Sequence, residues 1–137
     1  MMNNYITVVG AGYVGLSLAI LLAKNNHVKL LDIDEEKVNL VNKKKSPIVD
    51  ELIDKYLKHH DLRLVATTQK EIAFEKADFV IIATPTDYDA EKGNFNTTSI
   101  ESVLNDMLDY NLDSTVVIKS TIPLGYTEQL KKTYGNQ

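Results

Sequence analysis

Cysteine is absent from the 137 residues of this chain. Without a thiol, the chain can form neither a disulfide framework nor a thiolate metal site. The absence fits the reducing cytosol, and we therefore expect a cytoplasmic protein. It also bears on function, because these residues cannot supply a cysteine nucleophile to any reaction.

Positive charge is scarce as well. The chain has 15 basic against 19 acidic residues, which gives a net charge of −4 at pH 7. This balance argues against a nucleic acid or an anionic membrane surface as the main partner. The only basic run covers residues 43–45 and is explained by a solvated helix end, and the seven tyrosines show no pattern typical of nucleic-acid stacking.

The histidines do not form a set of metal ligands. His27 is expected at the start of a strand, whereas His59 and His60 are expected at the end of a helix. Adjacent histidines are poorly placed to share one ion, so surface positions explain them better. We predict no metal site.

One segment, residues 5–23, contains no charged residue and approaches the length that spans a bilayer. A signal peptide would need basic residues before the apolar stretch, and none precedes this segment. Its pattern also changes along its length, since residues 5–9 are typical of a strand, glycines follow, and apolar residues in 16–23 recur at helical spacing. A strand, a glycine turn and a buried helix explain all of this, and no membrane partner is predicted.

Strands alternate with helices along the whole chain. Parallel strands need crossover connections, so the alternation predicts a parallel sheet with helices on both faces. We therefore expect an α/β fold, a Rossmann-type doubly wound parallel sheet in three α/β/α layers, built as a single domain by residues 1–137. The expected strands are residues 5–9, 27–32, 62–66, 78–83 and 115–118.

Local signals predict three helix starts and one long loop. Ser46 is expected to cap a helix that has Pro47 at its first position. Residues 68–71 and 98–101 each have the Thr-x-x-Glu pattern of a capping box. The polar residues 84–96 indicate a loop, and loops of this length in compact domains are usually functional or disordered.

The sequence Gly-Ala-Gly-Tyr-Val-Gly at residues 10–15 has the glycine spacing of a dinucleotide-binding turn. Gly10 would permit the tight turn, Gly12 would let a pyrophosphate approach the backbone, and Gly15 would let the helix pack closely on the strand. The turn follows a predicted strand and opens a predicted helix, whose free N–H groups would face the phosphates. A turn with purely structural glycines is the alternative.

Asp32 ends the next predicted strand, where dinucleotide-binding domains hold the adenosine ribose. Its carboxylate should accept hydrogen bonds from the ribose hydroxyls and would repel a 2′-phosphate, so NAD is favoured over NADP. Lys37 could lie beside the same ribose, although an ordinary exposed helix lysine explains it nearly as well.

Two further segments follow predicted strands, and both carry threonines and a proline. They are residues 84–86, Thr-Pro-Thr, and residues 119–123, Lys-Ser-Thr-Ile-Pro. In open α/β sheets, ligands bind outside the carboxyl ends of the strands, which is where these segments would lie. Each threonine alone could be a capping residue, but two such loops at one sheet edge favour a binding site.

Taken together, these motifs resemble the UDP-glucose 6-dehydrogenase family and, more broadly, the dehydrogenases of UDP- and GDP-sugars. The resemblance covers essentially the whole chain, and the loop with Tyr88, Phe95 and Thr97 is similar to the bacterial UDP-glucose branch. The segments that carry it are residues 10–16, 32–34 with 37–38, 46–48, 83–89 and 119–125.

The resemblance implies NAD as the cofactor and a UDP-sugar as the substrate of a longer, homodimeric enzyme. It assigns cofactor contacts to the glycine turn with Tyr13 and Val14, and to Asp32, Lys37, Thr86 and Thr121. Thr121 would also help to position a catalytic water. Members of the family oxidise the C6 alcohol of the sugar to a carboxylate with two NAD in succession, through a thiohemiacetal on a cysteine.

This chain has no cysteine and ends at Gln137, so by the resemblance we expect it to be the N-terminal cofactor domain of a longer enzyme and to be inactive alone. A change of sugar, to UDP-N-acetylmannosamine or GDP-mannose, is the nearest alternative. A different class, the stand-alone nucleotide-sensing module of potassium transport systems, shares the glycine turn and the terminal acid. It would not need the loops at residues 84–96 and 119–125.

Overall fold

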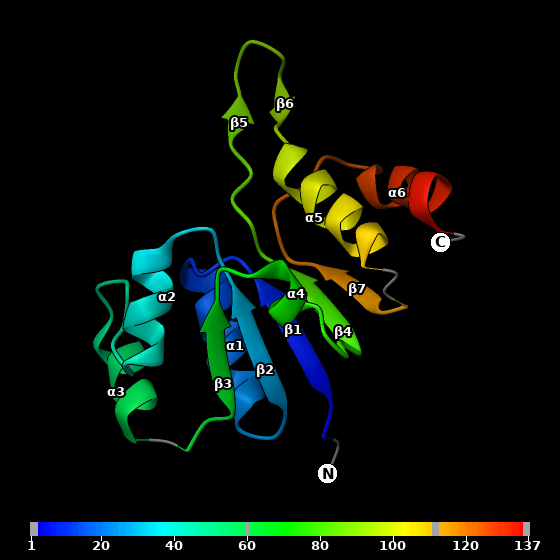
Figure 1. Cartoon of the computed structure of the whole chain (residues 1–137). Coiled ribbons are helices and arrows are strands. Elements are labelled where there is room, and N and C mark those ends of the chain that lie inside the picture. The colour runs from blue at the N-terminus through cyan, green and yellow to red at the C-terminus, as the bar shows by residue number, and fades with distance from the viewer. Residues whose placement is uncertain (1–2, 60, 111–112, 136–137) are drawn as a thin grey trace.

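The computed structural model describes residues 3–59, 61–110 and 113–135. Its centre is a five-stranded sheet in the order β3-β2-β1-β4-β7, and every neighbouring pair is parallel (Figure 1). The strands are β1 Tyr5–Val9, β2 His27–Leu31, β3 Leu64–Thr67, β4 Phe79–Ile82 and β7 Thr115–Ile118. The sheet order reverses between β1 and β4, which makes that edge the switch point of the fold.

Helices cover both faces of the sheet, so the predicted Rossmann-type three-layer α/β/α fold is confirmed. On one face, α1 Tyr13–Ala23, α2 Glu35–Asn42 and α3 Glu51–His59 enclose a core around Leu16, Leu30 and Val8. On the other face, α4 Lys70–Ala73, α5 Thr98–Asp109 and α6 Tyr126–Tyr134 pack around Phe74 and Ile82. In the described part of the chain no helix is long and apolar enough to cross a membrane.

The helix predicted to start at Ser46 begins later. α3 starts at Glu51, and Asp50 caps it by accepting hydrogen bonds from the backbone N–H groups of Leu52 and Ile53. The Ser46 hydroxyl instead forms a local turn with the backbone of Ile48. The prediction was wrong because a serine before a proline can close a turn as readily as it can cap a helix.

Neither predicted capping box forms. α4 is one turn long, follows Gln69, and has no side-chain cap. α5 follows Thr97 rather than Thr98, and the Thr97 hydroxyl donates to the Glu101 carboxylate at 3.3 Å instead of accepting a backbone N–H. Thr97 precedes Thr98 and takes the cap position, so the capping-box pattern placed the start of α5 one residue too late.

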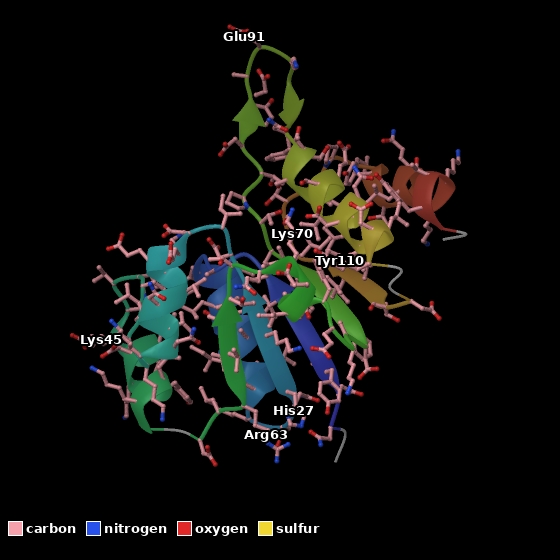
Figure 2. The ribbon with its side chains drawn as sticks, in the orientation of Figure 1. His27, Lys45, Arg63, Lys70, Glu91 and Tyr110 are labelled. Atoms are coloured by element: carbon pink, nitrogen blue, oxygen red, sulfur yellow. The ribbon has the colours of Figure 1, made fainter. Side chains whose placement is uncertain are left out.

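The segment 84–96, predicted to be a loop, contains a small antiparallel hairpin of β5 Tyr88–Asp89 and β6 Asn94–Phe95. The Asp89 carboxylate accepts from the N–H groups of Glu91 and Lys92 across the turn, and Gly93 adopts φ +67°. Figure 1 shows the hairpin rising away from the sheet, and Figure 2 places Glu91 at its outer turn. The signal for it was present, because a short turn with a glycine separates two aromatic residues, Tyr88 and Phe95, that pair across the strands.

Candidate cofactor site

The glycine turn between β1 and α1 lies against the end of β4. Gly10 has φ +107°, and a Cβ there would come within 2.6 Å of the Ala83 carbonyl oxygen. A Cβ on Gly15 would come within 1.8 Å of the Gly10 carbonyl oxygen. Both glycines are therefore required by the packing of the turn itself, as the sequence predicted for the tight turn and the helix–strand contact.

Gly12 is different, because a Cβ at this position would meet no atom within 4 Å. Its backbone is extended, with φ −78° and ψ −170°, so the protein alone gives no reason for a glycine. It immediately precedes α1, whose first turn holds no acidic residue. The free N–H groups of a helix start attract anions, and the open space at Gly12 lets a pyrophosphate come close to them.

Asp32 lies directly after β2, beside the glycine turn. One carboxylate oxygen accepts from the Ala11 backbone N–H at 2.7 Å and the other accepts from the Asp34 N–H at 2.8 Å. These two bonds hold the carboxylate in place, while its remaining lone pairs can still accept bonds from a ligand. The sequence predicted an acid here, and the structure shows how the acid is oriented.

The two threonine loops are joined to each other. The Thr86 hydroxyl donates to the Thr121 carbonyl at 2.7 Å, and the Ser120 hydroxyl donates to the Thr84 carbonyl at 2.7 Å. Both loops follow strands that pair directly, β4 and β7, which explains their proximity. The expectation that they meet at one sheet edge is confirmed.

A cavity of about 390 Å³ lies between the glycine turn and these loops. It reaches the size range of small-molecule sites in proteins. The residues predicted to contact the cofactor divide into two groups, because seven line this cavity and two do not. The seven that line it are Gly10, Gly12, Tyr13, Val14, Asp32, Thr86 and Thr121. Asp87, Lys119 and Ser120 also line the cavity, although the sequence did not predict them as cofactor contacts.

The two predicted residues outside the cavity are Gly15 and Lys37. Gly15 is buried beneath the turn, where it allows α1 to pack. Lys37 lies in the first turn of α2, and its backbone N–H donates to Asp34. Its contact with a cofactor stays a prediction.

A second cavity of about 300 Å³ adjoins the first and shares Gly10, Asp32, Thr84 and Pro85 with it. It lies between the end of β2 and helices α4 and α5, and Ile33 at its mouth is 97% exposed. No ligand-binding motif in the sequence pointed to the wall on α4 and α5, because these helices are far apart along the chain. Its apolar residues are Val9, Leu31, Ile33, Pro85 and Val103, and its polar ones include Thr68, Lys70, Ser99, Ser102 and Asp106.

The loop after β7 is anchored by Tyr126 at the start of α6. This side chain is buried, and its hydroxyl donates to the Glu101 carboxylate of α5 at 3.3 Å. Burial raises the pKa of Tyr126 above its usual range, so the phenol stays protonated and remains a donor. The anchor fixes the far end of the loop that carries Thr121.

No group of three or more metal-ligating side chains occurs within the described ranges. His27 stacks on the Tyr5 ring, with centroids 4.9 Å apart. His60 lies outside the described residues.

These two adjoining cavities fit a dinucleotide. The open position at Gly12 and the helix start suit the pyrophosphate, and the fixed carboxylate of Asp32 lies where both cavities meet, which suits a ribose. A ligand with two bases joined through phosphates would place one base in each cavity. The geometry of the two cavities therefore adds to the support that the glycine pattern gives for a dinucleotide cofactor.

Comparison with known proteins agrees. Residues 4–137 match the profile of the UDP-glucose/GDP-mannose dehydrogenase family, NAD binding domain. The chain is 50% identical over 131 residues to a UDP-glucose 6-dehydrogenase of Campylobacter jejuni and 44% identical over 129 residues to one of Streptococcus pneumoniae, covering 94% of this chain in each case. It covers 33% of each relative, so it spans about a third of their length.

Solved structures give the same family. The UDP-D-ManNAc dehydrogenase of Pyrococcus horikoshii superposes with a TM-score of 0.85 at 27% identity, over 96% of this chain and 32% of that one. The family match decides against the stand-alone nucleotide-sensing module, which was the alternative of a different class. The chain belongs to the UDP-glucose/GDP-mannose dehydrogenase family and forms its NAD-binding domain.

Proposed function

We propose that this domain holds NAD for the oxidation of UDP-glucose to UDP-glucuronate. The observation that carries the proposal is the pair of adjoining cavities that meet at Asp32. The two relatives with 44% and 50% identity, both named UDP-glucose 6-dehydrogenase, support the choice of sugar.

Each part of the cofactor has a place in this arrangement. The pyrophosphate lies at Gly12 and the start of α1, and the adenosine ribose bonds to Asp32. The nicotinamide half extends into the larger cavity toward Thr86 and Thr121, and adenine occupies the second cavity. When bound, NAD accepts the hydride that leaves the sugar carbon.

Thr121 is the residue of this domain that we place nearest the reacting centre. Its hydroxyl-bearing side chain is exposed and lines the larger cavity, and its carbonyl is fixed by Thr86. An exposed hydroxyl at that position can orient a water for the hydrolytic step. The thiol that the reaction also needs cannot come from residues 1–137, because they contain no cysteine. We therefore assign the cofactor to this domain, and the nucleophile and the sugar site to other parts of a longer, homodimeric, cytoplasmic enzyme.

A different sugar nucleotide is the second candidate. The likeness to the UDP-D-ManNAc dehydrogenase at a TM-score of 0.85 supports it. The cavity at the glycine turn holds the cofactor in either case, so this domain does not choose between the sugars.

The proposal predicts that the 137-residue chain binds NAD but completes no oxidation. Incubation with NAD and UDP-glucose should give no NADH absorbance and no UDP-glucuronate by chromatography. Formation of UDP-glucuronate by this chain alone would contradict the assignment of the nucleophile elsewhere.

A chimera tests whether this domain can serve the oxidation of UDP-glucose. Residues 1–137 would replace the matching part of the Campylobacter jejuni UDP-glucose 6-dehydrogenase, to which they are 50% identical. We expect the chimera to reduce NAD with UDP-glucose, with the unmodified relative as the control. A chimera that folds and binds NAD but does not turn over UDP-glucose would contradict the proposal.

A further inference from the structure

The far wall of the second cavity carries an ion pair to which the proposed function assigns no role. Lys70 Nζ at the start of α4 lies 3.0 Å from Asp106 Oδ2 on α5, and both residues line the cavity. The Lys70 side chain is 47% exposed and that of Asp106 is 22% exposed, so both can be reached from the cavity. In Figure 2, Lys70 lies in the space between α4 and α5.

The pair offers a strong donor and a strong acceptor side by side. The hydrogen bond and the charge of Asp106 raise the pKa of Lys70, so the ammonium keeps its protons at neutral pH. The Asp106 carboxylate accepts bonds only. A ligand edge with an acceptor next to a donor would therefore match this wall.

Adenine has such an edge, because its N7 accepts and its 6-amino group donates. A purine with an oxygen at position 6, such as guanine or hypoxanthine, presents two acceptors there. That oxygen would face the carboxylate, and the bond would be replaced by repulsion. The wall therefore distinguishes the two kinds of purine.

Ser99, Ile33 and Val103 are less suited to distinguish one base from another. The Ser99 hydroxyl already bonds to the Pro85 carbonyl and to the Thr84 hydroxyl, each at 2.9 Å. Ile33 and Val103 are apolar and can only contact the faces of a ring. These contacts hold any flat base, so they contribute affinity without choosing among purines.

We propose that the Lys70–Asp106 pair selects adenine by its 6-amino group, with Asp106 accepting from that group and Lys70 donating to the neighbouring ring nitrogen. The proposal rests on the proposed function, because it requires the adenine half of NAD in this cavity. It adds a specificity residue on α5, a helix that holds none of the predicted cofactor contacts.

The test compares NAD with nicotinamide hypoxanthine dinucleotide, in which an oxygen replaces only the 6-amino group. By titration calorimetry, we expect the chain to bind NAD about tenfold more tightly, the effect of one partly exposed hydrogen bond to a charged group. Asp106→Asn should bring the two affinities to within about twofold of each other, since an amide can either accept or donate.

Asp109→Asn is the matched control, because Asp109 is exposed on the same helix and does not line the cavity. This control variant should keep the tenfold preference.

Equal binding of both dinucleotides by the unchanged chain would overturn the proposal without requiring any variant. A preference that persists in Asp106→Asn would overturn it as well. Both results leave NAD binding intact, so they differ from failure of the proposed function, in which neither dinucleotide binds.

Discussion

Gly15→Ala should destabilise the fold severely. The new Cβ would lie 1.8 Å from the Gly10 carbonyl oxygen, which is backbone and cannot rotate away. Relief requires α1 to move off the sheet, where it buries Leu16, Ala19 and Ile20. We expect a loss of about 3 kcal/mol or more in the free energy of unfolding, which corresponds to a fall in Tm on the order of 10 °C. Thermal and urea unfolding followed by circular dichroism would measure both.

Gly12→Ala is the matched control for the fold and a direct test of the site. Its Cβ meets no atom of the protein, so we expect a Tm close to that of the unchanged chain. The same Cβ occupies the space where the pyrophosphate should approach the backbone. NAD affinity should therefore fall on the order of 10- to 100-fold, as for the loss of one charge-assisted hydrogen bond. A variant at position 12 that keeps both its Tm and its NAD affinity would show that this opening holds no phosphate.

Asp32→Ala should produce the second large effect. It removes the carboxylate at the junction of the two cavities, and with it the bonds to the ribose hydroxyls. Bonds to a charged acceptor contribute about 1.5–3 kcal/mol each, so NAD affinity should fall by at least about tenfold. NADP should lose less affinity or gain some, because the charge that repels its 2′-phosphate is gone.

A control is needed because Asp32 also binds the N–H groups of Ala11 and Asp34. Glu35→Ala removes an equal charge three positions away, on an exposed residue that lines neither cavity. It should leave the affinities for NAD and NADP unchanged. Equal NAD affinity in Asp32→Ala and in the unchanged chain would remove Asp32 from the ribose site.

The sequence predicted the fold and the larger cavity well, for physical reasons. β1 and β4 are almost continuously apolar because helices cover both faces of the sheet, and such strands are recognisable without any tertiary information. The glycine turn and Asp32 were equally accessible, because one short βαβ unit builds them and places them together. For the same reason, the loops after β4 and β7 could be assigned to one sheet edge from strand order alone.

The second cavity could not be predicted in this way. Lys70 and Asp106 are brought together by the packing of α4 and α5, which are distant in sequence, and neither belongs to a ligand-binding motif. Two helix starts were also misplaced, because Ser46 closes a local turn while Asp50 caps α3, and because Thr97 precedes Thr98 at the start of α5. Local patterns identify which segments are helices, whereas the contacts of individual polar side chains decide where those helices begin.

We infer that this domain binds NAD across the two cavities that meet at Asp32. The most direct measurement is an NMR titration of the isotopically labelled 137-residue chain with NAD, following backbone amide shifts. We predict saturable shifts at Gly12, Asp32, Lys70 and Thr121, which together span both cavities. Absence of shifts at millimolar NAD, or shifts confined to the groove between α1 and α3 around Leu21 and Ile53, would contradict binding of NAD across these two cavities.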